Sequence, residues 1–249
     1  MVRSIAATAQ KRLELWSRFL NGIEARTVAE VGVYMGHFAG HVLDTCPSVD
    51  RYYMIDPWRH LEDWNKPANK RDRRFERIFE QAMDRTSRHE DRRIVLRGRT
   101  TEVIDRIPDG TLDFAYIAGD HTLRGITVDL ARVYPKVREG GWIGCDDFYQ
   151  SLWYHGEEFE PTLVFPFAVY FAEAVSAQAF ALPAGQFLME KRSDAEFGFH
   201  DLTGKYGELG LVSHMSPRPP PPDPSRGRAT LARRTLARLR RSWGRPRSG

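Results

Sequence analysis

Two patterns of apolar residues alternate along the chain. Short apolar runs, typical of strands, are separated by segments in which apolar residues recur every three or four positions, as in helices. The runs predict strands at 27–33, 52–55, 94–96, 112–117, 142–145, 177–181 and 186–191. The segments between them predict helices at 13–20, 37–43, 72–86, 101–107, 126–137 and 169–175, with Gly140-Gly141 closing the helix at 126–137.

This alternation predicts an α/β fold. Strands that alternate with helices form a Rossmann-like, doubly wound and mostly parallel sheet, here of seven strands, with helices on both faces. Ligands of such sheets lie beyond the carboxyl ends of the strands. We therefore look for chemistry directly after the predicted strands, at Gly32, Asp56, Gly98, Asp120 and Asp146.

Composition divides the chain into three parts. The strand and helix pattern fills residues 1–192, a short extension follows at 193–216, and a tail rich in Pro and Arg occupies 217–249. The tail opens with a polyproline-type spacer and holds ten Arg and one acid. The whole chain has a net charge of +4, so the rest of the chain must have a negative net charge. The basic balance therefore gives no general argument for nucleic-acid binding.

The tail contains a segment with helical spacing. Ala232, Leu236, Leu239 and Trp243 share one stripe that arginines surround. One interpretation is a disordered solubilising tail. The other is a basic amphipathic helix that contacts an anionic membrane surface or an acidic partner.

Several classes of protein are excluded. No run of about 18 apolar residues predicts a transmembrane segment, and the N-terminus lacks the apolar stretch of a signal peptide. Cys46 and Cys145 are the only cysteines and lie far apart, which excludes a disulfide framework or zinc cluster and favours the cytoplasm. HExxH and GxSxG are absent, so peptidase and hydrolase functions have little support.

The first strand–helix junction carries a glycine motif. The residues Glu30 to Gly36 read E-x-G-x-x-x-G, which differs from the dinucleotide motif and lacks the lysine of a phosphate loop. Gly32 permits a tight turn, and Gly36 admits a ligand against the start of the helix. Asp56 ends the second strand about twenty residues later, where an acid can accept both hydroxyls of a ribose. Together these residues predict a nucleoside pocket without a pyrophosphate cradle.

The ordered motifs resemble those of class I S-adenosylmethionine (SAM)-dependent methyltransferases over residues 10–192. The nearest likeness is to small-molecule O-methyltransferases of the catechol type and to bacterial sugar O-methyltransferases, so residues 1–192 are interpreted as the methyltransferase domain. The resemblance implies SAM as cofactor and is compatible with a homodimer. It implies that the methionine end lies at Glu30, Gly32, Tyr34 and Gly36, the ribose at Asp56, and adenine at Gly98, Thr100 and Thr101, with Asp120 also at the cofactor.

Three carboxylates follow the fourth and fifth strands. Asp120, Asp146 and Asp147 should converge, because adjacent parallel strands lie about 4.8 Å apart. Such oxygen ligands suit Mg²⁺, which would hold two substrate oxygens. Related enzymes place the first metal-binding Asp where this chain has Ala118. The alternative is that the acids bind sugar hydroxyls, helix N-termini or His121.

His121 follows the fourth strand at the position where the related enzymes carry a catalytic His or Lys. A neutral imidazole can take the proton of a hydroxyl as its oxygen attacks a methyl group, with Asp120, Asp146 or Asp147 orienting the ring. The remaining histidines of the domain lack this context and are interpreted as surface or packing residues. They include His37, His41, His60, His89 and His155.

The predicted reaction is methyl transfer to a hydroxyl of a sugar or glycoside, with His121 as general base. A phenolic or other natural-product hydroxyl is the alternative acceptor. Aromatic rings suited to a sugar lie in loops near the expected site, or else pack an irregular lid, at Trp58, Trp64, Trp153 and Tyr154. A hypothesis of another class is a methyltransferase-like module that binds nucleic acid through the Arg-rich tail, which the intact Glu30 to Gly36 motif disfavours.

Overall fold

The computed structural model describes residues 1–9 and 11–207. Its strands are β1 (Thr27–Val31), β2 (Arg51–Asp56), β3 (Arg93–Arg97), β4 (Leu112–Ile117), β5 (Val137–Cys145), β6 (Gln178–Leu182), β7 (Gln186–Glu190) and β8 (Gly198–Asp201). Its helices are α1 (Val2–Thr8), α2 (Arg12–Gly22), α3 (His37–Thr45), α4 (Asp72–Arg85), α5 (Thr100–Val103), α6 (Leu123–Val133) and α7 (Val164–Ala174). Short 3₁₀ turns occur at Ser87–His89, Ile104–Arg106, Tyr134–Lys136 and Pro183–Gly185.

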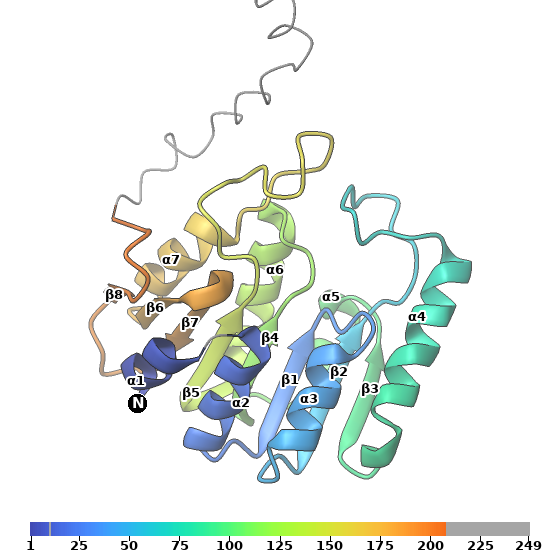
Figure 1. Cartoon of the computed structure of the whole chain (residues 1–249), viewed down its shortest axis with the longest axis horizontal. Coiled ribbons are helices and arrows are strands. Elements are labelled where there is room, and N and C mark those ends of the chain that lie inside the picture. Colours follow the sequence, from blue (N-terminus) through green and yellow to red (C-terminus); the bar gives the residue numbers. More distant parts are fainter. Residues whose placement is uncertain (10, 208–249) are drawn as a thin grey trace, which may run out of the picture. The chain divides into compact units, whose positions relative to one another are not determined.

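The strands form one sheet in the order β3-β2-β1-β4-β5-β7-β6-β8 (Figure 1). Strands β1 to β5 pair in parallel, β7 is antiparallel to both β5 and β6, and β8 is parallel to β6. The predicted α/β fold with a mostly parallel, doubly wound sheet is therefore confirmed. The sheet has eight strands rather than the seven predicted.

Each face of the sheet buries its own apolar cluster. Helices α2, α3 and α4 cover one face, and α6 and α7 cover the other (Figure 1). Successive strand residues point to opposite faces, so that Val28 of β1 packs under the first group and Ala29 under the second. The strands are apolar on both sides for this reason, which is why short continuous apolar runs identified them.

The segment between α6 and β5 differs from the prediction. We expected a helix to residue 137 with Gly140-Gly141 closing it, but α6 ends at Val133 and both glycines lie inside β5. The register between β4 and β5 shifts here, and Gly140 adopts φ +70°. The glycines thus mark an irregularity within a strand, a position that glycine also favours.

Strand β8 lies beyond residue 192, in the segment interpreted as an extension. It pairs with β6 from Gln178 opposite Gly198 to Ala181 opposite Asp201. Its residues, GFHD, contain no apolar run, so the sequence carried no signal for it. The polyproline spacer and the amphipathic segment of the tail lie outside the described residues. None of the helices described has the length and apolar character needed to span a bilayer.

Candidate active site

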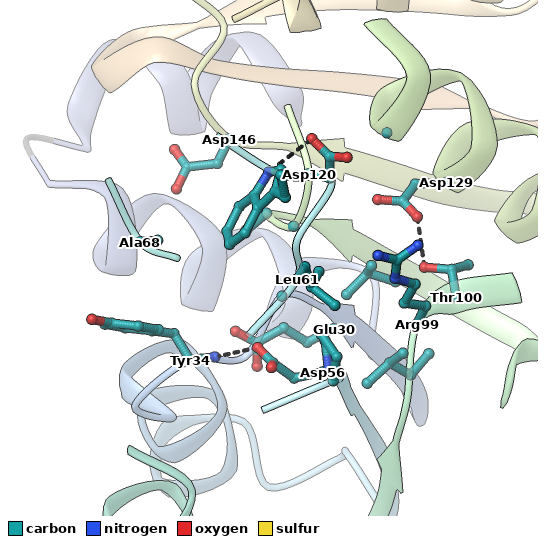
Figure 2. A pocket seen from close by; sticks show the side chains of 18 of the residues that line it. Glu30, Tyr34, Asp56, Leu61, Ala68, Arg99, Thr100, Asp120, Asp129 and Asp146 are labelled. Atoms are coloured by element: carbon teal, nitrogen blue, oxygen red, sulfur yellow. Dashed lines mark hydrogen bonds between the residues drawn. The ribbon is translucent and has the colours of Figure 1, made fainter. Parts of the chain in front are cut away.

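A cavity of about 520 Å³ lies at the carboxyl ends of the central strands (Figure 2). This volume is within the range of about 300–1,000 Å³ that is common for small-molecule sites. The residues predicted from sequence that line it are Glu30, Gly32, Tyr34, Asp56, Gly98, Thr100, Thr101, Asp120 and Asp146. Gly36 precedes α3 and is not among the lining residues, whereas its neighbours Met35 and His37 are.

Gly32 allows the ends of β1 and β4 to approach each other. Its φ is +89°, and a Cβ atom there would lie 2.3 Å from the carbonyl oxygen of Ala118. A side chain would therefore clash with the backbone in a conformation that already disfavours it. The glycine is needed for the close contact between the two strand ends from which the cavity is built.

Asp56 is fixed at the cavity wall by backbone donors. Its carboxylate accepts hydrogen bonds from the amides of Tyr34 (2.8 Å) and Trp58 (2.7 Å). Figure 2 shows the bond from Tyr34 and places Glu30 beside Asp56. Burial raises the pKa of Asp56 to about 6, although the backbone hydrogen bonds oppose that shift. Asp56 is therefore held rigidly and remains close to its titration range at neutral pH.

Glu30, the residue before the last one of β1, lines the same cavity. The Tyr52 hydroxyl donates a hydrogen bond of 2.8 Å to its carboxyl group. Burial raises the pKa of Glu30 to about 8, and the bond from Tyr52 and the charge of Arg12 only partly offset this. Glu30 is thus mostly protonated near neutral pH.

The cavity lining includes residues that were not predicted, among them the charged Arg12 and Asp129. Arg12 forms an ion pair with Asp146, since α2 packs Trp16 into the core and Arg12 lies one turn earlier on the same face. Asp129 of α6 accepts a hydrogen bond of 2.6 Å from the Thr100 hydroxyl, and burial raises its pKa to about 7. Each residue occupies a position in an ordinary helical pattern, so no local signal identified it.

A second cavity of about 230 Å³ adjoins the first. The two share the wall formed by Trp64, Ala68, Ala118, Gly119 and Asp146. The remaining lining residues are Lys66, Pro67, His121, Asp147 and His155. They come from the loops that follow β2, β4 and β5, which all emerge at the same edge of the sheet (Figure 1). The shared wall makes the cavities neighbouring compartments of one site.

His121 and Asp147 form a hydrogen-bonded pair in the second cavity. Nδ1 of His121 lies 2.9 Å from Oδ2 of Asp147. A carboxylate only accepts, so we assign the ring proton to Nδ1, which leaves a lone pair on Nε2. Nε2 is buried and has no hydrogen-bond partner among the described residues. Burial lowers the pKa of His121, but the hydrogen bond and charge of Asp147 outweigh it and raise the pKa overall.

The backbone of Asp147 adopts φ +51°, in the left-handed region. Such a conformation costs a non-glycine residue about 1–3 kcal/mol and is concentrated at functional sites. The sequence left open which of three carboxylates orients His121. The structure pairs the ring with Asp147, while Asp120 accepts hydrogen bonds from Trp64 Nε1 (3.0 Å) and from the Thr122 amide (3.0 Å).

Comparison with known proteins identifies the domain. Residues 29–148 match the family model described as a methyltransferase domain. This match and the fold are consistent with a class I SAM-dependent methyltransferase. None of the curated proteins compared with this sequence matches it.

Solved structures share the fold of this methyltransferase. A Staphylococcus aureus protein assigned as a caffeoyl-CoA O-methyltransferase is 12% identical, with a TM-score of 0.53, 74% of this chain covered and 85% of that chain. Cofactor-bound Rv0187 from MTB is 15% identical, with a TM-score of 0.54 and coverages of 78% and 87%. The O-methyltransferase from Bacillus cereus in complex with S-adenosylhomocysteine (SAH) is 16% identical, with a TM-score of 0.53 and coverages of 76% and 87%. At these identities the likeness establishes the fold alone.

His155 was interpreted as a surface or packing residue, and that interpretation is wrong. It lines the second cavity of the methyltransferase, where Nε2 lies 3.4 Å from Oδ2 of Asp147 and Nδ1 lies 3.1 Å from the Thr162 hydroxyl. Of the predicted aromatic residues, Trp64 lines both cavities. Tyr154 instead stacks on Tyr149, with ring centroids 4.2 Å apart, and lines neither cavity.

The residues proposed for Mg²⁺ do not fit a metal ion. Asp146 is ion-paired with Arg12 and accepts a 2.7 Å hydrogen bond from Gln186 Nε2, and Asp147 is paired with His121. Among the described residues, no group of three or more His, Cys, Asp or Glu side chains could hold a metal ion. The described residues therefore do not support the magnesium prediction. Ala118 removes one carboxylate from the set, and Arg12, which no motif revealed, supplies positive charge instead.

Proposed function

We propose that this protein is a SAM-dependent O-methyltransferase that methylates a hydroxyl group of a small molecule, with His121 as general base. The observation that carries the proposal is the His121–Asp147 pair. Its unpartnered Nε2 lies in a cavity that shares a wall with the larger one. The larger cavity would hold SAM and the smaller one the acceptor.

The larger cavity suits SAM. Asp56 would accept the ribose hydroxyls, Glu30, Gly32 and Tyr34 would surround the methionine end, and the segment from Gly98 to Thr101 would face adenine. When bound, SAM supplies a methyl group activated by its sulfonium. The similar structures from Bacillus cereus and MTB, which carry SAH and a cofactor respectively, support this assignment.

The smaller cavity suits a hydroxyl acceptor. His121 with its proton on Nδ1 can accept the hydroxyl proton at Nε2, and the resulting imidazolium would be stabilised by the Asp147 carboxylate. The acceptor oxygen takes the methyl group, and SAH remains. Because His121 must be neutral to act, its raised pKa predicts that the rate rises with pH through that pKa.

For the acceptor we propose a sugar or glycoside hydroxyl, with a phenolic or other natural-product hydroxyl as the alternative. Trp64 supplies an aromatic wall suited to either ring. The S. aureus neighbour is assigned as a caffeoyl-CoA O-methyltransferase, which supports the alternative of a natural-product hydroxyl. The hypothesis of a nucleic-acid-binding module depends on the tail at 217–249, outside the described residues.

The test is a transfer assay with SAM carrying a labelled methyl group, against panels of monosaccharides, glycosides and phenols. We expect label in an ether that survives mild base, together with stoichiometric SAH. Calorimetry with SAM is run in parallel. SAM binding without label transfer to any hydroxyl compound would refute O-methyl transfer. RNA or DNA binding that is steeply salt-dependent and lost on deleting 217–249 would favour the other class.

A further inference from the structure

Lys66 is a buried lysine in the loop between β2 and α4. Only 5% of the residue is exposed. Its ammonium donates to the carbonyl oxygen of Glu160 (2.7 Å) and to the hydroxyl of Thr162 (3.0 Å). Both acceptors are uncharged, and the described part of the chain contains no carboxylate within 4 Å that forms an ion pair with Lys66.

A buried charge without an ion-pair partner is costly, and a further acceptor oxygen or anion bound beside it would offset part of that cost. Burial lowers the pKa of Lys66, and the more distant carboxylates Asp120, Asp147 and Glu160 only oppose that shift. An ammonium has three protons to donate. Two are used by Glu160 and Thr162, which leaves one for a further acceptor.

Lys66 lines the same small cavity as His121. One wall therefore offers a hydrogen-bond donor that lacks an acceptor, and another offers Nε2, an acceptor that lacks a donor. The other charges of the cavity are already matched, since Asp146 pairs with Arg12 and Asp147 with His121. A single hydroxyl group could bond to both side chains, because its proton can go to Nε2 of His121 while its oxygen accepts a hydrogen bond from Lys66.

We propose that Lys66 is the cation of the acceptor site and stabilises the negative charge that develops on the acceptor oxygen. This inference rests on the proposed function and deepens it. The O–H bond of the acceptor breaks, its proton passes to Nε2 of His121, and the oxygen keeps the electron pair beside the Lys66 ammonium. That oxygen then bonds to the methyl carbon of SAM as the carbon–sulfur bond breaks, leaving SAH. The acceptor class is an alcohol or phenol that ionises within the site.

If its role were purely structural, Lys66 would only connect two loops through its hydrogen bonds to Glu160 and Thr162, which belong to the segment after β5. Two variants separate the roles. Lys66→Met removes both the charge and the hydrogen bonds between the loops. Thr162→Val removes one of these hydrogen bonds and keeps the charge. Lys66→Arg retains the charge, and Lys70→Met is a matched control at an exposed lysine of the same loop.

The experiment uses 4-nitrophenol as probe, because its anion absorbs at a different wavelength from the neutral phenol. The SAH-loaded full chain is titrated with the probe across pH, and thermal melts confirm that each variant is folded. We expect the bound phenol to ionise at lower pH than the free phenol in wild type, Lys66→Arg, Thr162→Val and Lys70→Met. In Lys66→Met we expect the ratio of bound phenolate to bound phenol at a given pH to fall by about tenfold, equivalent to one pKa unit.

Catalysis gives the second readout. Removing one group that stabilises a developing oxyanion costs about 10²–10³ in kcat, so Lys66→Met should lose that much while SAM affinity is unchanged.

Bound phenolate that is equal in Lys66→Met and wild type, or absent from wild type, would overturn the proposal. An equal loss of kcat in Thr162→Val would show that Lys66 acts only by connecting the two loops. Phenolate binding without methyl transfer to any acceptor would refute the proposed function and leave the cation site standing. Lys66→Gln replaces Lys66→Met if the latter does not fold.

Discussion

The two neighbouring cavities use carboxylates in opposite ways. In the larger cavity, Glu30, Asp56 and Asp129 are buried with neutral donors, and burial raises their pKa values to about 8, 6 and 7. In the smaller cavity, Asp147 is buried as well, but its hydrogen bond and charge interaction with His121 hold its pKa below the usual range. The carboxyl groups of the larger cavity therefore lose their protons at a higher pH than is usual for carboxylic acids, whereas Asp147 in the smaller cavity loses its proton at a lower pH.

This difference indicates what each cavity does. Carboxyl groups that form no ion pair can adjust their protonation when a polar, positively charged ligand such as SAM arrives. The ionised Asp147 carboxylate instead keeps a negative charge beside His121, which orients the base and raises its pKa. We therefore expect variants of the smaller cavity to change the rate and its pH dependence, and variants of the larger cavity to change cofactor affinity and stability.

The largest expected effect is that of His121→Ala. Loss of a positioned general base lowers kcat by about 10²–10⁴. SAM affinity, measured by calorimetry, should stay close to that of wild type, because His121 lines only the smaller cavity. His60→Ala, at an exposed histidine outside both cavities, is the control. A variant that keeps most of its kcat would show that another group takes the proton.

Asp147→Asn should lower kcat by about 10–100-fold, since a hydrogen bond to a charged partner contributes about 1.5–3 kcal/mol. It should also move the pH profile. Asp147 raises the pKa of His121, so its loss lowers the pH at which the rate begins to rise; the nearby charges of Asp146 and Lys66 remain. An unchanged profile, recorded as kcat against pH, would separate Asp147 from the base.

Asp56→Asn should weaken SAM binding by about 1–3 kcal/mol, or roughly 5–150-fold, because ribose hydroxyls lose an acceptor. The amides of Tyr34 and Trp58 bond different oxygens of Asp56, so asparagine keeps an acceptor for only one of them, whereas alanine would leave both without one. Calorimetry measures the affinity, and thermal melts measure the stability. Asp84→Asn, on the exposed side of α4, is the control. Unchanged affinity would remove Asp56 from the cofactor site.

Glu30→Gln should change how stability depends on pH. The pKa of Glu30 is raised in the folded state, so its contribution is fully present below about pH 4.5 and is lost as pH rises through about 8. The wild type should therefore lose up to about 5 kcal/mol of unfolding free energy over this window that Glu30→Gln retains, as measured by urea unfolding at several pH values. Glu80→Gln, at an exposed position, should behave as wild type. Parallel curves for wild type and Glu30→Gln would contradict the buried, protonated Glu30.

The smallest expected effect is that of chelation. Because Asp146 and Asp147 are already paired with Arg12 and His121, excess EDTA should leave methyl transfer unchanged, and added Mg²⁺ should not raise it. Loss of activity in EDTA with recovery on adding Mg²⁺ would restore the metal site that the structure argues against.

The amino-acid sequence by itself determined most of the sheet and most of the lining of the larger cavity. Apolar runs such as 112–117 must be strands buried on both faces, and parallel strands bring their carboxyl ends to one edge. Residues that directly follow a strand are therefore placed at the site by topology alone. This is why Gly32, Asp56 and His121 could be assigned to one region from their positions in the chain.

Only the tertiary structure decided the charges of the site. Arg12 neutralises Asp146 because the packing of Trp16 fixes how α2 lies on the sheet. Lys66 and His155 reach the smaller cavity through loops that carry no periodic pattern. Strand β8 forms because β6 offers it an open edge, although its own residues carry no strand signal. Pairing between distant side chains depends on how whole elements pack, and for this reason the sequence predicted where the acids lie but not which of them remain free to bind a metal.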